Sequence, residues 1–256
     1  MSDAPHRFSR LAGGWHIGDA FFVRAGLATQ APAPRGLVDR LEDLAGAGVD
    51  CARVSPSVRT FFEDPASLDL RVRSRWRAGF GFAWRLARGV MGAIGQLHLP
   101  LDTARVRTRM VALDGAREGR ADARGVVRSY ADTDDVFQVF VYGVARTSSG
   151  PRMSVAIPLP GGHLAGLLRL EVSNDGAEVA LTSRRASRDD PVGVWFVTRL
   201  GSLRLPLEET LCFWSANAPG APTFAQTGAA MVASHEQRLF GCVVVEHEYS
   251  FRPLTG

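Results

Sequence analysis

The residues best suited to acid–base chemistry lie near the end of the chain, between residues 231 and 253. If this run forms two strands around its central Phe-Gly turn, His235 and His247 lie at similar distances from the turn and face each other. Strand alternation puts Tyr249 on the face of His247 and the two neighbouring glutamates on the other. An imidazole on an apolar inner face stays neutral, as a general acid or base requires. His247, His235 and Tyr249 are therefore the candidate catalytic residues, and a hydrogen-bonded core histidine is the alternative interpretation.

A metal site ranks below these two interpretations. His235 and Glu236 begin like the H-E-x-x-H zinc motif, but Leu239 occupies the position of the second ligand. Two histidines alone do not make a metal site, and nothing in the sequence brings His98 or His163 to them. We therefore predict that the protein uses no metal and no cofactor.

The basic residues exclude several classes of enzyme. All 30 are arginines, so Schiff-base enzymes, P-loop nucleotidases and protein kinases, which need a lysine, are excluded. A formal net charge of +4 is too small to indicate nucleic-acid binding. Three cysteines without C-x-x-C spacing predict buried, reduced thiols and a cytoplasmic protein. No apolar run reaches the roughly 18 residues that a membrane span needs, so we predict none.

Aromatic and arginine side chains suggest where a ligand would bind. Large β-barrels can enclose an apolar pocket, and the candidate ligand-binding aromatic residues are Trp76, Trp84, Phe140, Tyr142, Trp195 and Trp214. Alternation separates Phe137 from Phe140, so not every aromatic residue can line one pocket. Arginines alternate along 71–77 and 105–109, and paired guanidinium groups can hold a phosphate or carboxylate. Arg73 and Arg75 join the candidates, although nearby acids would also neutralise such a face.

The segments that must position these residues are mostly strands, because apolar and polar residues alternate along them. This alternation predicts strands over 67–77, 105–113, 123–131, 135–146, 152–159, 164–172, 177–184, 192–199, 203–215, 229–239 and 242–252. The turns between them are short, as in the Asn-Asp-Gly of 174–176. From residue 105 onward, no helix separates the strands. This arrangement indicates an antiparallel sheet closed or nearly closed into a barrel, or a two-layer sandwich.

The helices are expected near the N-terminus. Helical spacing predicts one over 35–47 and one over 80–94, the latter with a stripe of Phe82, Leu86, Val90 and Ile94. A serine N-cap followed by proline predicts a short helix from residue 55 to 64. Residues 1–34 are expected to be an arm and linker lying across the main body. The predicted fold class is α+β: a single domain over 35–256, with two to three helices mainly in 35–95 packed on a large antiparallel barrel or curved sheet (67–77 and 105–256).

Three pieces of the chain, 57–63, 95–101 and 240–253, resemble uncharacterised bacterial YndJ-type domains. The resemblance implies a bacterial origin and a β-rich domain, and it assigns no site residues. With no cofactor motif present, the expected function is binding of an apolar small molecule in a barrel pocket. The protein would be a carrier or a cofactor-independent cyclase or isomerase of bacterial secondary metabolism. The alternative is a non-catalytic module whose arginine face binds an acidic partner or a lipid headgroup.

Overall fold

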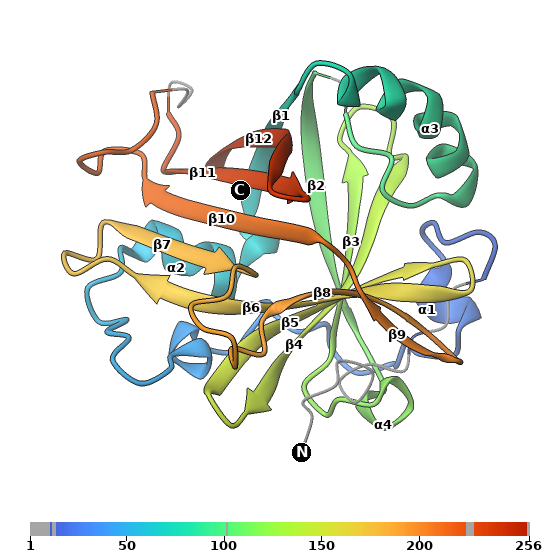
Figure 1. Ribbon diagram of the computed structural model, residues 1–256, viewed down its shortest axis with the longest axis horizontal. Coiled ribbons are helices and arrows are strands. Elements are labelled where there is room, and N and C mark those ends of the chain that lie inside the picture. Colours follow the sequence, from blue (N-terminus) through green and yellow to red (C-terminus); the bar gives the residue numbers. More distant parts are fainter. Residues whose placement is uncertain (1–10, 12–13, 101, 224–227, 255–256) are drawn as a thin grey trace.

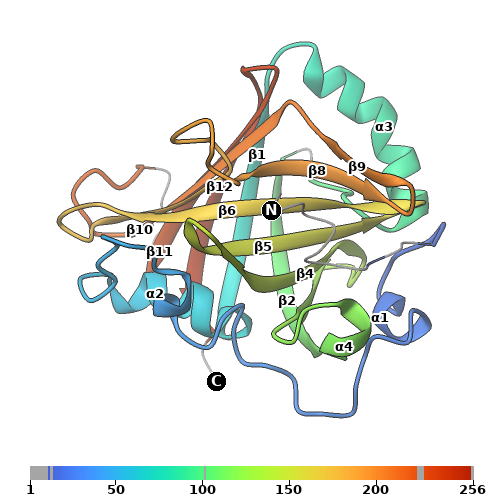
Figure 2. The ribbon, with the colours of Figure 1, turned by 60° about the horizontal axis from the view of Figure 1, so that its bottom comes forward.

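The strands form one antiparallel sheet, most of which closes into a barrel (Figures 1 and 2). The computed structural model describes residues 11, 14–100, 102–223 and 228–254. The strands of this part are β1 (Leu68–Trp76), β2 (Thr103–Ala112), β3 (Arg124–Tyr130), β4 (Val136–Thr147), β5 (Gly150–Leu159), β6 (Gly162–Val172), β7 (Glu178–Thr182), β8 (Gly193–Thr198), β9 (Gly201–Arg204), β10 (Leu207–Ser215), β11 (Met231–Leu239) and β12 (Cys242–Pro253). Their order is β5-β4-β3-β2-β1-β12-β11-β10-β7-β6, and β6 pairs with β5 to complete the ring. The predicted α+β fold with a large antiparallel barrel is confirmed.

Two features of the ring matter below. β1 pairs with β12 along the whole length of β1, from Leu68 opposite Pro253 to Trp76 opposite Val245. On one edge, β6 pairs with β8 through residues 162–167 and then with β7 through 169–172, so the sheet forks there. β8 and β9 leave the ring at this fork as a hairpin. The single strand predicted over 203–215 is therefore two, β9 and β10.

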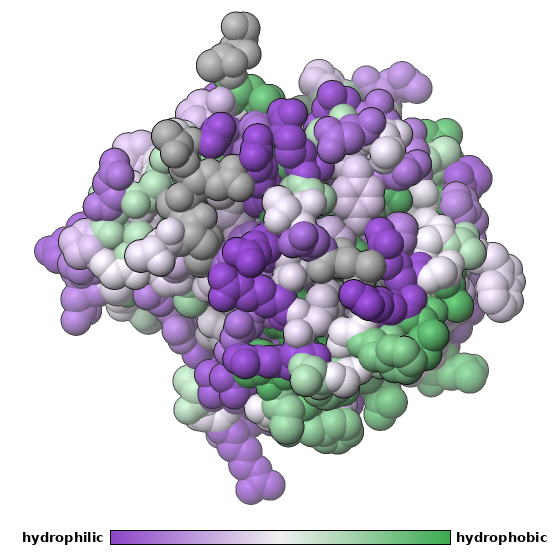
Figure 3. All heavy atoms as spheres, turned by 90° about the horizontal axis from the view of Figure 1, so that it is seen from above, coloured by the Kyte–Doolittle hydropathy of each residue, from purple (hydrophilic) through white to green (hydrophobic). Residues whose placement is uncertain are grey.

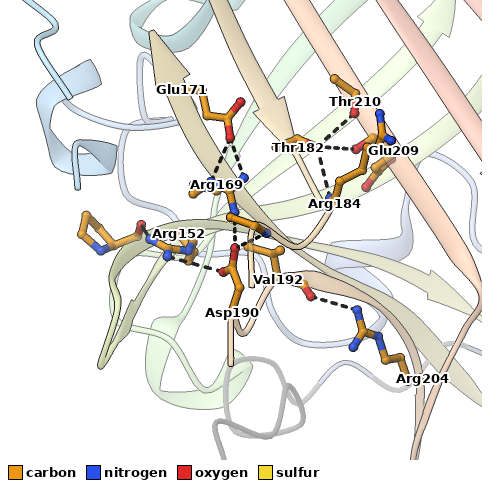
Figure 4. Close-up of polar contacts among 12 residues, drawn as sticks. Arg152, Arg169, Glu171, Thr182, Arg184, Asp190, Val192, Arg204, Glu209 and Thr210 are labelled. Carbon is orange, nitrogen blue, oxygen red and sulfur yellow. Dashed lines mark hydrogen bonds and ion pairs between the residues drawn. The ribbon is translucent and has the colours of Figure 1, made fainter. Parts of the chain in front are cut away.

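The fork is held by buried charges (Figure 4). Asp190, in the loop before β8, forms ion pairs with Arg169 of β6 and with Arg152 of β5. The same carboxylate accepts a hydrogen bond of 3.1 Å from the backbone N–H of Ala186. Arg204 of β9 donates to the carbonyl oxygen of Val192. The loop between β7 and β8 is thereby tied to the wall of the barrel.

Two of the three predicted helices form. The helices are α1 (Phe21–Arg24), α2 (Pro56–Glu63), α3 (Phe80–Ile94) and α4 (Gly115–Glu118), with 3₁₀ turns at Leu41–Leu44 and Pro65–Ser67. The Ser55 side chain caps α2 as predicted, accepting a hydrogen bond from the backbone N–H of Val58. The helix predicted over 35–47 is wrong, because the N–H groups of Leu37 and Val38 donate to the Phe62 carbonyl at the end of α2. With these bonds residues 35–39 form a series of bends, and only the 3₁₀ turn follows.

The hydrophobic core has two parts. One fills an end of the barrel, where Phe61 and Phe62 of α2 pack against Phe213 of β10. The other lies outside the barrel, where residues of the N-terminal segment, including Ile17 and Phe22, cover β3, β4 and β5. α2 and α3 lie on opposite sides of the barrel (Figures 1 and 2). β3 to β5 are therefore buried on both faces.

Candidate functional site

The barrel encloses a cavity of about 320 Å³. Its wall extends from Phe61 of α2 to Trp84 of α3 and is made mostly of leucine, isoleucine, valine and aromatic side chains. Polar side chains enter it at a few positions: Arg128, Gln138, Tyr142, Glu209, His235, Gln237, His247 and Tyr249. A largely apolar cavity with a small set of polar groups is the usual form of a small-molecule site.

Strand alternation explains which side chains of β12 enter the cavity. His247, Tyr249 and Phe251 line its wall. The two glutamates that flank His247 point outward, where Glu248 pairs with Arg75 at 2.7 Å and Glu246 with Arg77 at 3.2 Å. The glutamates adjacent to His247 in sequence are therefore not its chemical partners.

His235 and His247 face each other across the hairpin of β11 and β12. Their ring centroids are 5.7 Å apart. His235 Nε2 lies 3.1 Å from a carboxylate oxygen of Glu209 on β10, and His247 Nδ1 lies 2.8 Å from the hydroxyl of Ser74 on β1. Because a carboxylate only accepts hydrogen bonds, His235 carries its hydrogen on Nε2. The site thus holds a Glu–His pair beside a second, hydroxyl-bonded histidine.

Gly166 of β6 makes room for this pair. A Cβ atom at that position would lie 3.3 Å from a carboxylate oxygen of Glu209. The absence of a side chain therefore lets the carboxylate rest against the wall of the barrel while it accepts from His235.

Burial decides the protonation of the central side chains. Removal from water, with a further contribution from His235, lowers the pKa of His247 to about 3. Burial also raises the pKa of the Tyr142 and Tyr249 phenols. At neutral pH the imidazole of His247 is uncharged and both tyrosines keep their protons. This part of the wall therefore offers neutral hydrogen-bonding groups.

The lowered pKa of His247 predicts a loss of stability in acid. Below about pH 6.5 the unfolded chain protonates this histidine, whereas the folded protein does so only near pH 3. The unfolded state then binds more protons, so this contribution to the free energy of unfolding falls as the pH falls, by about 1.4 kcal/mol per pH unit. Urea unfolding at pH 7 and pH 5 should show that the wild type loses about 2 kcal/mol more than His247→Asn, whose amide can still bond Ser74. Equal losses in both proteins would contradict it.

Arg128 of β3 is the unpaired cation of the cavity. Within the described residues no carboxylate lies within ion-pair distance of it, and its buried Nε has no hydrogen-bond partner. Its guanidinium carbon lies 5.4 Å from the centre of the Phe140 ring. Arg128 is half-buried and has no carboxylate to neutralise it, so a ligand that offers an anionic or carbonyl oxygen would gain a charge-assisted hydrogen bond here. Arg128 and Glu209 are not among the site residues predicted from the sequence, although Arg128 is in phase with the inward-facing Val126.

The structure brings only some of the predicted ligand residues together. Trp76, Trp84, Phe140 and Tyr142 line the cavity, whereas Trp195 and Trp214 do not. Trp195 lies under the Arg204 guanidinium at 5.6 Å. Trp214 lies on the outer face of β10, because strand alternation gives the inner position to Phe213. Its indole N–H donates a hydrogen bond to the carboxylate of Glu178 on β7. Arg73 and Arg75 also lie outside the cavity, beside Glu248.

The arginine rows are largely neutralised on the outside of the barrel. Besides the pairs with Glu246 and Glu248, Arg105 pairs with Asp69, Arg107 with Asp134 and Arg109 with Asp19. Arg71 has no ion pair among the described residues. Opposite charges across strands explain the rows as a stabilised outer face. They give little support to the alternative function, in which this face binds an acidic partner.

His98, His163 and the cysteines do not line the cavity. His163 Nδ1 is 2.6 Å from the Leu11 carbonyl oxygen, and His98 packs beside Tyr130. In the part of the chain that the structure describes, no three His, Cys, Asp or Glu side chains are grouped to hold a metal ion. All three cysteines are free. The prediction of buried thiols fits Cys51 but is wrong for Cys242, which is exposed at the start of β12.

Comparison with known proteins finds one similarity of note. No family model and no solved structure matches the chain. The chain is similar to the uncharacterised membrane protein YndJ of Bacillus subtilis (strain 168), with 25% identity over 252 residues, which are 97% of this chain and 44% of the relative. The chain thus spans less than half of that relative's length. The predicted resemblance to YndJ-type domains is confirmed.

The same comparison contradicts the prediction of a cytoplasmic protein, because the relative is a membrane protein. Among the described residues, none of the helices has the length and apolar character needed to cross a membrane.

Proposed function

We propose that the barrel binds a small molecule with an apolar body and one anionic or carbonyl head group. The observation that carries the proposal is Arg128, which has no ion pair among the described residues and lies in the wall of a largely apolar cavity. The apolar body would lie against leucine and aromatic side chains such as Phe140, and the head group would accept hydrogen bonds from the guanidinium. Glu209 and His235 would accept hydrogen bonds from a donor group on the same ligand.

The dimensions of the cavity support a ligand of small-molecule size. About 320 Å³ is at the lower end of the range of roughly 300–1,000 Å³ for such sites. Burial of apolar ligand surface contributes roughly 25 cal/mol for each Å². Burial of the apolar part of a ligand could thus supply most of the binding free energy. Arg128 would then discriminate between apolar molecules by their head groups.

A cavity-filling variant tests the proposal. Leu211 of β10 lines the cavity and is only partly buried, so the larger ring of Leu211→Trp would extend into the empty volume. We expect the wild type to bind the neutral dye N-phenyl-1-naphthylamine, seen as enhanced dye fluorescence, and Leu211→Trp to lose at least about tenfold in affinity. A tenfold loss is what about 1.4 kcal/mol of lost contact produces.

The matched control is Leu203→Trp, the same substitution at an exposed position of β9. It should bind the dye as the wild type does. Thermal unfolding of all three proteins checks that they remain folded. Wild-type affinity in Leu211→Trp, or no dye binding by the folded wild type, would show that the cavity is not the binding site.

Acid–base catalysis on the same ligand is a second candidate, favoured by the contact between Glu209 and His235. The carboxylate would orient the imidazole, so that His235 could move a proton on the ligand. A cofactor-independent isomerase or cyclase needs such a step. The test is deuterium exchange from D₂O into a molecule that co-purifies with the protein, followed by mass spectrometry. Exchange that persists in His235→Asn would rule out this role.

A membrane location is proposed by similarity to YndJ. Fractionation of cells that produce the protein, followed by immunoblotting, should find it with the membranes. Recovery in the soluble fraction alone would contradict this location.

A further inference from the structure

The outer face of α3 is an exposed apolar stripe. Phe82, Leu86 and Val90, spaced four residues apart, are 70%, 68% and 60% exposed. Trp15, which is 88% exposed, adjoins the C-terminal end of the helix, since His16 Nδ1 lies 3.1 Å from the Ala93 carbonyl oxygen. Figure 3 looks down on this end of the molecule and shows hydrophobic side chains gathered over α3, toward the lower right. Water is a poor solvent for such a face, and exposed apolar patches mark interaction surfaces.

The inner face fixes the helix in this orientation. Trp84 stacks on Trp76 of β1, with ring centroids 4.9 Å apart and planes 10° from parallel. At the C-terminal end, the N–H of Ile17 donates to the carbonyl oxygen of Ile94 over 2.6 Å. The stripe therefore points outward because the opposite face of the helix is already packed, and rotation of α3 would break the indole stack.

The segment of sequence that carries the stripe has charges of one sign. Between residues 70 and 101 the chain has six arginines and no aspartate or glutamate. Three of these arginines, on or just after β1, pair with glutamates of β12. Arg85 of α3 is exposed, and no ion-pair partner for it exists among the described residues. The helix thus combines an apolar stripe with a cation that remains free.

We propose that α3 and Trp15 lie flat in the interface of an anionic lipid bilayer. Phe82, Leu86 and Val90 would enter the boundary between headgroups and acyl chains, as the apolar face of an interfacial amphipathic helix does. Trp15 would sit at headgroup level, where its ring is apolar and its N–H can stay hydrated. Arg85 would contact lipid phosphates. The complementary charge distinguishes a bilayer from a second copy of this chain, whose α3 would repel it.

The proposal is independent of what the cavity binds, but it gives α3 a position between bilayer and cavity. Trp84 lines the cavity, while Phe82 and Leu86 on the same helix face outward. A bilayer-bound α3 would therefore hold that side of the barrel against the membrane surface.

Vesicle flotation tests the proposal. Phosphatidylcholine vesicles with about 30% phosphatidylglycerol should carry the wild-type protein, and pure phosphatidylcholine vesicles should carry much less, because each arginine near an anionic surface adds to binding. Leu86→Glu and Arg85→Glu should each weaken binding by about tenfold or more, the first by removing an apolar anchor and the second by reversing a charge. The matched control is Leu203→Glu, at an exposed leucine of the β8–β9 hairpin, which should float as the wild type does.

Three outcomes would overturn the proposal. One is equal binding by Leu86→Glu and the wild type, and another is loss of binding in Leu203→Glu to the same degree. The third is a wild-type dimer in size-exclusion chromatography that Leu86→Glu dissociates while neither protein floats, since a second copy would then cover the stripe. N-phenyl-1-naphthylamine binding, measured on the same variants, should stay at the wild-type level. Failure of α3 to bind lipid is therefore distinguishable from failure of the cavity to bind a ligand.

Discussion

Replacing Arg128 with methionine is expected to weaken binding of 8-anilinonaphthalene-1-sulfonate by roughly 10- to 100-fold. The sulfonate would accept hydrogen bonds from the guanidinium inside the cavity, and bonds to charged groups are worth about 1.5–3 kcal/mol. Methionine keeps an apolar side chain of similar length without the charge. N-phenyl-1-naphthylamine has the same two aromatic groups and no sulfonate, so its affinity should change by less than about twofold. Fluorescence titration of both dyes measures the difference.

The matched control is Arg73→Met, because Arg73 lies on the outer face of β1, with a carboxylate oxygen of Glu248 3.9 Å away. That variant should bind both dyes as the wild type does. If Arg128→Met lost both dyes together, the substitution would have damaged the cavity rather than the anion site. If it lost neither, Arg128 would not select the head group, and the proposed ligand class would be wrong.

Replacing Phe213 with alanine should cost about 3–5 kcal/mol of the free energy of unfolding, as large-to-small changes at buried aromatic residues do. Phe213 is 1% exposed, and its ring lies 4.7 Å from that of Phe61 and 5.3 Å from that of Phe62. These contacts join α2 to the barrel wall, so α2 would lose its support as well as its packing. Chemical denaturation followed by circular dichroism measures the change.

Leu200→Ala is the control, because that side chain is fully exposed in the turn between β8 and β9. Its cost should be within about 0.5 kcal/mol of zero. A loss below about 1 kcal/mol in Phe213→Ala would mean that α2 does not depend on this contact. The free energy of unfolding of a whole domain is only about 5–15 kcal/mol. The predicted loss would therefore populate the unfolded state if the wild type lies at the lower end of that range.

The parts of the barrel that were easiest to predict from the sequence are the strands with one solvent-exposed face and one buried face. In β1 and β12 this contrast is strong, because arginines and glutamates alternate with apolar side chains. The two-residue period of a strand can therefore be recognised in this single sequence. The hairpin register follows from the same pattern, and it correctly places His235 opposite His247. Helix α3 was also predictable, although the spacing of its stripe does not reveal that the stripe faces outward.

What could not be predicted depends on contacts between distant segments. Strand alternation predicts that Phe137 and Phe140 lie on opposite faces of β4. Both nevertheless belong to the same core cluster, because the pairing register of β3 and β4 shifts between Arg128 and Ser129. A bulge of this kind changes the face of the sheet to which the following side chains point, and the sequence contains no clear sign of it. Arg128 and Glu209 were missed for a related reason. A charged residue in an alternating strand normally marks the wet face, and only the closed ring shows that the dry face contains a cavity.

The pairing of β1 with β12 also affects how the chain folds. The ring needs contact between residue 68 and residue 253, so it cannot close during synthesis until residue 253 has been made. Until then β1 is an open edge with unpaired backbone groups, which could pair with another molecule and aggregate. Arg71, Arg73 and Arg75 place like charges along that edge. We expect these arginines to disfavour pairing between nascent chains until β12 is made, whose Glu248 then pairs with Arg73 and Arg75.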